Sequence, residues 1–148
     1  MKVSIKQIGE KKDEQVIIEC VAVTAEIERI QSFVLANGTI LTGLFEERMY
    51  QFPLEEVYYF EAVDERVFAY TKGKSYEMKI RLYELESAFS EHYFVRCSKS
   101  FVLNLMKLES LSPALNGRFC AHMKNGEKII ISRQYVPHIK QIVLRGKA

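Results

Sequence analysis

The sequence predicts a mainly β protein of the α+β class, made of antiparallel sheets with a few short helices. Three observations lead to this prediction. Short runs of β-branched and aromatic residues recur from residue 39 onward, separated by polar, turn-like segments. Helical periodicity is confined to three stretches, near residues 24–37, 82–90 and 133–144. The strands follow one another closely, which favours antiparallel meanders because parallel strands need longer crossovers.

Size and composition suit one domain with a short extension. The chain has 148 residues, of which 48% are hydrophobic, enough for an adequate core. No apolar run approaches the ~20 residues of a membrane span, and the N-terminus does not resemble a signal peptide. Three cysteines without a CxxC pair suit a reducing compartment. We therefore expect a soluble cytoplasmic protein.

Charge is unevenly distributed along the chain. Residues 1–91 contain 11 Lys and Arg against 17 Asp and Glu, a net charge of −6. Residues 92–148 contain 10 Lys and Arg against 2 Asp and Glu, a net charge of +8. This segregation predicts a polyanionic partner for the C-terminal part. The alternative is that the two parts neutralise each other in the folded protein.

The N-terminal region predicts two short strands and a helix. Residues 3–8 alternate polar and apolar side chains, and residues 16–21 are apolar enough for a buried strand. Thr24 is a suitable N-cap for the helix that follows. The helix has one narrow apolar stripe, formed by Ile27, Ile30 and Val34. We expect this stripe to pack on the two preceding strands.

A series of strands follows, interrupted by one helix. The expected strands are residues 40–45, 49–52, 57–62, 67–71 and 76–80, and after the helix near 82–90 they are residues 108–111, 118–123 and 128–131. The pair Asn125-Gly126 predicts a type I′ turn, which needs positive φ at both central positions. The consecutive residues Tyr58, Tyr59 and Phe60 cannot all share one sheet face, which favours core packing over an RNA-stacking surface.

Residues 94–104 contain the strongest candidate site. The two ends of this stretch predict strands, while Cys97-Ser98-Lys99-Ser100 separates them with small polar groups and one cation. We expect a surface turn that holds Lys99 rigidly toward an anion. Arg133 is placed similarly, because Ser132 marks the junction between a strand and the last helix. In both places a strand fixes the base of a cationic side chain.

Enzymatic motifs are missing from the sequence. It contains no P-loop, dinucleotide-binding glycine pattern or nucleophile elbow. The histidines lack metal-ligand spacing, so we expect no enzymatic activity, no cofactor and no metal. One enzymatic alternative is Cys97 as a nucleophile with His92 or His122 as its base, in which Arg96 and Lys99 would lower the pKa of the thiol. No third, orienting residue is evident, and we prefer a small buried residue at the end of a strand.

Five segments follow one another in an order and at spacings that are specific to a family. They are VYYFEA (residues 57–62), LYELE (82–86), FVRCSKSFVLN (94–104), NGE (125–127) and ISRQYV (131–136). Together they resemble the LytTR (LytR/AlgR-like) DNA-binding domain of bacterial response regulators, over roughly residues 45–145. The resemblance implies antiparallel sheets of the LytTR type, whose loops enter successive major grooves of promoter DNA.

The resemblance also implies which residues contact DNA. The loop of residues 98–100 and Arg133 match family positions that reach base edges. A third family contact matches the loop of residues 64–66, which here is short and partly acidic and offers Glu65 and Arg66. We expect a sequence-specific transcription regulator.

Each of these residues has an expected role. Lys99 and Arg133 would donate hydrogen bonds to guanine O6 and N7 in the major groove. The hydroxyls expected to bond phosphate oxygens are those of Ser98, Ser100 and Ser132. Sequence-independent attraction would come from Arg96, Lys107, Lys128 or Lys140, unless Arg96 supports the loop instead.

The expected domain organisation has two parts. Residues 1–44 form a β/α extension for dimerisation or signal input, and residues 45–148 form the DNA-binding domain. The extension is too short for a receiver domain, so the chain resembles the receiver-less members, some of which are controlled by partner membrane proteins. We expect a homodimer on repeated half-sites in promoter DNA. The alternative is a protein-binding regulator, such as an anti-activator, that uses the same fold without DNA.

Overall fold

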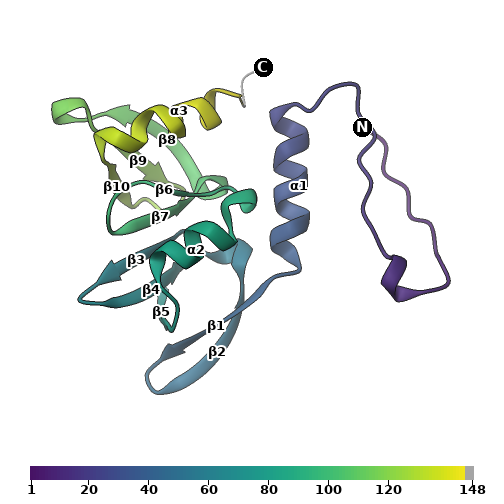
Figure 1. The fold of residues 1–148 in the computed structure, drawn as a ribbon, viewed down its shortest axis with the longest axis horizontal. Helices are drawn as coiled ribbons and strands as arrows, with labels where there is room; N and C mark the ends of the chain where they lie inside the picture. Colours follow the sequence, from purple (N-terminus) through teal and green to yellow (C-terminus); the bar gives the residue numbers. More distant parts are fainter. Residues whose placement is uncertain (146–148) are drawn as a thin grey trace.

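Two antiparallel sheets and flanking helices form the fold of the protein (Figure 1). The computed structural model describes residues 1–145, apart from the side chains of residues 36 and 37. Helix α1 (Ala25–Asn37) lies beside the sheets, and the first 24 residues run along its outer side as an extended segment (Figure 1). The mainly β class with short helices is confirmed.

The larger sheet has seven strands in the order β2-β1-β5-β4-β3-β7-β6. They are β1 (Ile40–Phe45), β2 (Arg48–Pro53), β3 (Tyr59–Val63), β4 (Arg66–Thr71), β5 (Lys74–Met78), β6 (Phe94–Arg96) and β7 (Phe101–Asn104). The neighbouring strands pair antiparallel. The expected strands between residues 40 and 80 are all present, displaced by at most two residues. The expected division between residues 44 and 45 falls inside β1, and the division into two parts stays a prediction.

The smaller sheet has three strands in the order β10-β9-β8. They are β8 (Leu108–Pro113), β9 (Phe119–Met123) and β10 (Lys128–Ile131), and the remaining helices are α2 (Leu82–Ala88) and α3 (Val136–Arg145). Short 3-10 turns connect several elements: η1 (Lys11–Asp13), η2 (Leu54–Glu56), η3 (Ser90–His92), η4 (Leu105–Lys107), η5 (Leu115–Gly117) and η6 (Arg133–Tyr135). The last helix therefore opens as a 3-10 turn and becomes α-helical at Val136. Within residues 1–145, no helix is both long and apolar enough to cross a bilayer.

The larger sheet separates two hydrophobic cores. Successive residues of a strand point to opposite faces, so Phe60, Phe94 and Val102 pack with α2 on one face. Their neighbours Tyr59, Val95 and Leu103 face the smaller sheet and α3 on the other. Tyr58, Tyr59 and Phe60 are all buried, which confirms core packing for these aromatic residues.

One expectation about a hairpin differs from the structure, and two other hairpins have a geometry that the sequence did not predict. The turn at Asn125-Gly126 is not type I′, because Gly126 has a positive φ of 89° whereas Asn125 does not. Its φ values fit a longer loop that closes with a left-handed glycine. Type I′ geometry occurs instead where no glycine predicts it: Glu46-Glu47 has φ values of 48° and 66°, and Asp64-Glu65 has values of 49° and 65°. Each pair joins two strands directly.

The strands expected at residues 3–8 and 16–21 are wrong. Both segments lie outside the two sheets, and Val3, Ile5 and Val16 are largely exposed. Alternation signals a tendency toward β structure, but a strand forms only when a neighbour satisfies its backbone groups. Without those strands, the apolar stripe of α1 cannot pack as expected. Thr24 does cap the helix, since its hydroxyl accepts a hydrogen bond from the Ile27 N–H at 3.4 Å.

Candidate nucleic-acid interface

Several loops meet at one end of the molecule, which we call the loop end and define by residues 64–66, 97–100, 114–118 and 132–133. The loop of residues 97–100 lies at its centre. On one side the Ala62 N–H donates to the Ser100 carbonyl at 2.8 Å, next to the β3–β4 hairpin. On the other side the Ser132 N–H donates to the Cys97 carbonyl at 2.9 Å. Backbone hydrogen bonds thus join all three loops that the sequence singled out.

The smaller sheet contributes the remaining loop. Its register pairs Pro113 with Phe119 and Phe119 with Ile131, so β8 ends, β9 starts and β10 ends at the same place. The loop between β8 and β9 therefore lies beside Arg133. A Cβ atom on Gly117 would lie 2.9 Å from Cδ of Arg133, so the arginine side chain rests on this glycine. The β3–β4 hairpin and the start of α3 lie on the side of the molecule away from α1 (Figure 1).

Arg96 holds the central loop in shape. Its Nε donates to the Ser98 carbonyl at 2.7 Å, and its Nη2 donates to the Lys99 carbonyl at 2.9 Å. Nη1 forms an ion pair with Glu86 of α2 at 3.3 Å. Within the turn, the Ser100 N–H donates to the Ser98 hydroxyl at 3.1 Å. Because its donors already have protein acceptors, Arg96 braces the loop from the inside.

Lys99 and Arg133 both project from the loop end into solvent. Within residues 1–145, neither the Lys99 ammonium nor the Arg133 guanidinium has a carboxylate partner. A cation with a fixed base and a free tip can bind an anion or a carbonyl-type acceptor without first breaking an internal ion pair. Serine hydroxyls accompany them, and Ser98, Ser100 and Ser132 are all partly exposed.

Cys97 serves the loop end as a buried support. Its side chain is fully buried, and burial raises the pKa of its thiol to about 12, although Arg96 acts in the opposite direction. A nucleophilic cysteine needs the reverse shift. One candidate base, His122, shares a hydrogen bond with the Ser112 hydroxyl at 2.8 Å. Cys97 is therefore the small buried residue that we preferred, and the lowered pKa of the enzymatic alternative is wrong.

The third loop is the β3–β4 hairpin. Glu65 and Arg66 are exposed, and Nη1 of Arg66 lies 3.8 Å from the Glu77 carboxylate. An exposed pair at this distance is weak, so Arg66 is available to another anion. Asp64 and Glu65 place two negative charges at the tip of the hairpin.

Lys107 is an expected contact that lies away from the loop end. It precedes β8, and Leu108 pairs with Met123 at the end of the smaller sheet farthest from Arg133. Its Nζ stands over the Tyr58 ring, 5.3 Å from the centroid. Close by, the Tyr59 hydroxyl donates to the Glu127 carboxylate at 2.5 Å. We call this region, η4 with the hairpin of residues 124–127, the opposite end.

The sequence left the bracing by Arg96 open, and it did not predict the contact between Gly117 and Arg133. The pair Asn116-Gly117 was a signal for a tight turn, and both residues have positive φ, 61° and 77°. Lys140 of α3 lies over the Phe119 ring, with Nζ 4.8 Å from the centroid, and adds a further cation beside this loop.

A β scaffold that presents unpaired cations from braced loops at one end suits binding to a polyanion such as DNA. The chain belongs to the LytTr DNA-binding domain family, whose model matches residues 47–144. This family is one of DNA-binding domains and not of enzymes. The solved LytTr DNA-binding domain of a response regulator from Bacillus cereus shares the fold, with a TM-score of 0.67 at 24% identity over 71% of this chain and 96% of that chain.

Curated relatives are similar to this chain over comparable lengths. The transcriptional regulatory protein YpdB of Escherichia coli strain K12 is 30% identical over 99 residues, 66% of this chain and 41% of that protein. An uncharacterized HTH-type transcriptional regulator of Staphylococcus aureus strain NCTC 8325 is 31% identical over 119 residues, 77% of this chain and 80% of that protein. The chain thus spans about two fifths of the length of YpdB and most of the length of the staphylococcal relative.

Proposed function

We propose that the loop end reads promoter DNA, and that the protein is a sequence-specific transcription regulator acting in the cytoplasm. The observation that carries this proposal is the hydrogen bond from the Ser132 N–H to the Cys97 carbonyl. It brings two loops from distant parts of the sequence together, each with an unpaired cation. Two cations whose bases are held side by side suit contacts to base edges in the major groove.

Lys99 and Arg133 are the base-reading residues of this proposal. Arg133 can donate two hydrogen bonds to O6 and N7 of one guanine, and Lys99 donates one. A good bidentate contact discriminates against a wrong base by about 1–3 kcal/mol. Ser98, Ser100 and Ser132 donate to phosphate oxygens, which sets the register of the protein on the duplex.

The surrounding residues have supporting roles. Arg96 is a positioning residue, because its donors hold the carbonyls of Ser98 and Lys99. Arg66 contacts phosphate from the β3–β4 hairpin, with Glu65 beside it. Lys107 at the opposite end contributes only long-range attraction, which salt screens over about 8–10 Å.

The wider assembly also belongs to this proposal. One small domain rarely gives enough specificity, so two copies bind repeated half-sites as a homodimer. A membrane protein is a candidate partner that controls the regulator.

The decisive experiment selects bound fragments from random DNA at two salt concentrations. Wild-type protein is expected to enrich a repeated motif containing guanine, and the salt slope counts its phosphate contacts. The variant Lys99→Ala/Arg133→Ala should lose the guanine preference while it keeps most of the salt slope. If the double variant enriches the same motif with unchanged affinity, the contact assignment is wrong. If folded wild-type protein enriches nothing, the anti-activator alternative replaces this function.

A further inference from the structure

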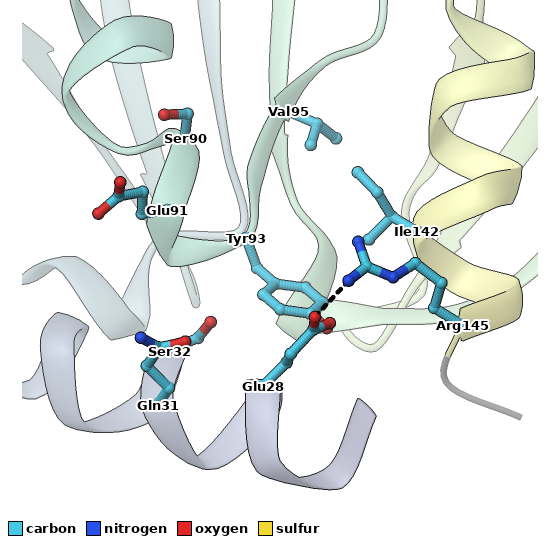
Figure 2. Close-up of a pocket in the computed structure, with 9 residues that line it drawn as sticks. All are labelled: Glu28, Gln31, Ser32, Ser90, Glu91, Tyr93, Val95, Ile142 and Arg145. Carbon is cyan, nitrogen blue, oxygen red and sulfur yellow. Dashed lines mark hydrogen bonds and ion pairs between the residues drawn. The ribbon is translucent and has the colours of Figure 1, made fainter. Parts of the chain in front are cut away.

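Helix α1 binds the rest of the protein through its polar side. Ala25 and Ser32, seven residues apart, are 5% and 2% exposed. Between them, the Glu28 carboxylate accepts a hydrogen bond from the Tyr93 hydroxyl at 3.4 Å and forms an ion pair with Arg145 of α3. Figure 2 shows Glu28 reaching from α1 toward both partners across a pocket. Small and charged groups, not the apolar stripe, therefore hold α1 in place.

The apolar stripe of α1 points away from the sheets. At 100° per residue, Ile27, Ile30 and Val34 centre on the side of the helix opposite Ala25 and Ser32. Val34 is 37% exposed, and Ile27 and Ile30 are half-buried. Among the described side chains, which leave out those of residues 36 and 37, neither hydrophobic core includes a residue of α1. The apolar side of the helix thus lies outside both cores and is only partly covered.

The spacing of this stripe is that of a two-helix seam. Val23, Ile27, Ile30 and Val34 follow one another at intervals of four, three and four residues, as a and d positions of a heptad do. Ala25 and Ser32 then occupy the f position, which faces directly away from a seam. The residues that touch the domain and the residues of the seam consequently do not compete for the same side of α1.

We propose that α1 pairs along this seam with α1 of a second copy of the chain. A symmetric dimer needs a self-complementary surface, and like charges facing each other would oppose it. The positions beside the seam within α1 are Glu26, Gln31 and Phe33. Glu26 is the only charge among them, so it meets Gln31 or Phe33 of the second copy in either direction of pairing.

The preceding segment supplies the rest of the interface. The 13 residues of α1 cover about two heptads, which is too little for the ~1,000 Å² that a specific interface needs. Just before the helix, Ile17, Val21 and Val23 are 69%, 108% and 70% exposed. Their burial against the second copy extends the seam and places these apolar residues out of water. This dimer gives the repeated half-sites of the proposed function a physical basis, but its formation does not depend on DNA.

Sedimentation of the full chain without DNA tests the proposal. Wild-type protein is expected to pass from monomer to dimer between about 1 and 200 μM, and Ile27→Glu or Ile30→Glu should weaken association roughly 100-fold or more. Leu35→Glu is the matched control, since Leu35 is 39% exposed on the same helix but lies off the seam. Unchanged circular dichroism verifies the fold of each variant. A wild-type monomer throughout, or an equal effect of Leu35→Glu, would overturn the seam.

Cross-linking gives a second readout that needs no disruptive substitution. In a Cys20→Ser/Cys120→Ser background, Ile30→Cys should form a covalent dimer under mild oxidation, whereas Leu35→Cys should not. Equal cross-linking at both positions contradicts the proposal. Binding of the Ile30→Glu variant to a single half-site reports separately on the loop end, so loss of the dimer and loss of DNA binding can be told apart.

Discussion

The two ends of the molecule are built from similar parts that face different surroundings. Each end has a glycine with positive φ in a connection of the smaller sheet and a lysine beside it. At the loop end, Lys99 is free and Gly117 supports Arg133. At the opposite end, Lys107 stands over Tyr58, and Gly126 has open space around it. The proposed binding surface lies only where the backbone gathers unpaired cations, so the opposite end supplies matched controls.

The largest expected effect is that of Arg133. Arg133→Ala should lower affinity for the selected DNA by roughly 5- to 150-fold, the 1–3 kcal/mol of a bidentate base contact. Affinity for random DNA should fall much less, because phosphate contacts remain. Titrations of both DNAs at one salt concentration measure the two effects. Lys107→Ala serves as the control at the opposite end and should change either affinity by no more than about threefold. Comparable losses for the two variants would contradict the difference between the ends.

The next effect is that of the brace beneath the loop. Arg96→Ala removes the donors that hold the Ser98 and Lys99 carbonyls, so the loop loses its fixed shape and DNA affinity should fall about tenfold. Faster amide hydrogen exchange at residues 98–100 should accompany this loss, which a direct phosphate contact would not produce. Arg96→Lys should restore little of the lost DNA affinity, since an ammonium cannot reproduce the fork of a guanidinium. Unchanged exchange in Arg96→Ala would show that the brace is dispensable.

Replacing the acidic residues at the tip of the β3–β4 hairpin should raise both stability and DNA affinity. Asp64→Asn/Glu65→Gly introduces the pair that type I′ turns favour, so unfolding should cost about 1 kcal/mol more. It also removes two negative charges from the loop end, and DNA affinity should rise about fivefold at low salt. Glu46→Asn/Glu47→Gly makes the same change in the β1–β2 hairpin and should raise the free energy of unfolding without raising DNA affinity. Thermal unfolding and DNA titration measure the two quantities, and an equal rise in affinity for both variants would place DNA elsewhere.

A smaller expected effect on DNA binding distinguishes Gly117 from Gly126. Gly117→Ala and Gly126→Ala each force alanine into a left-handed conformation and should destabilise the fold by about 1–2 kcal/mol. Only Gly117→Ala also displaces the Arg133 side chain, so it alone should weaken specific DNA binding, by roughly threefold. The measurement is the affinity of each variant at a temperature where both are fully folded. Equal affinities would mean that the contact between Gly117 and Arg133 does not position the guanidinium.

The smallest expected effect is that of Cys97 on the free energy of unfolding, and this effect should leave DNA affinity unaffected. Burial raises the pKa of its thiol from 9.0 to about 12, so the folded protein keeps this proton between pH 9 and 12 while the unfolded chain releases it. Cys97 therefore makes the free energy of unfolding decrease as pH rises through that range. At pH 8, a thiol probe should label the exposed Cys20 quickly and Cys97 only on unfolding. Rapid labelling of Cys97 in the folded protein would reopen the enzymatic alternative.

Local pattern was sufficient for most of the fold. The strands at residues 40–45 and 128–131 were predicted with the bounds they have, because β-branched runs there end at clear turn residues. The geometry of the hairpin tips at Glu46 and Asp64 was harder to predict, since the paired strands impose positive φ on residues that do not prefer it. The prediction of strands in the N-terminal segment was wrong for the opposite reason. The alternation of polar and apolar residues is present, but no strand within the described chain pairs with the segment.

The candidate site was likewise only partly predictable from the sequence. Lys99 and Arg133 were recognisable because each follows a strand at an abrupt polar break. Their proximity was implied only by the family resemblance, since it depends on a backbone hydrogen bond between residues 97 and 132. The roles of Arg96 and Gly117 depend on atoms distant in the sequence, which hydrophobic periodicity does not encode.

The link between the two central loops uses only main-chain atoms, a Ser132 N–H and a Cys97 carbonyl. Mutation can therefore exchange the side chains that protrude from either loop while the spacing between them stays constant. Under the proposed function, a regulator built in this way can acquire new target sequences one base position at a time. The distance between those positions is inherited unchanged.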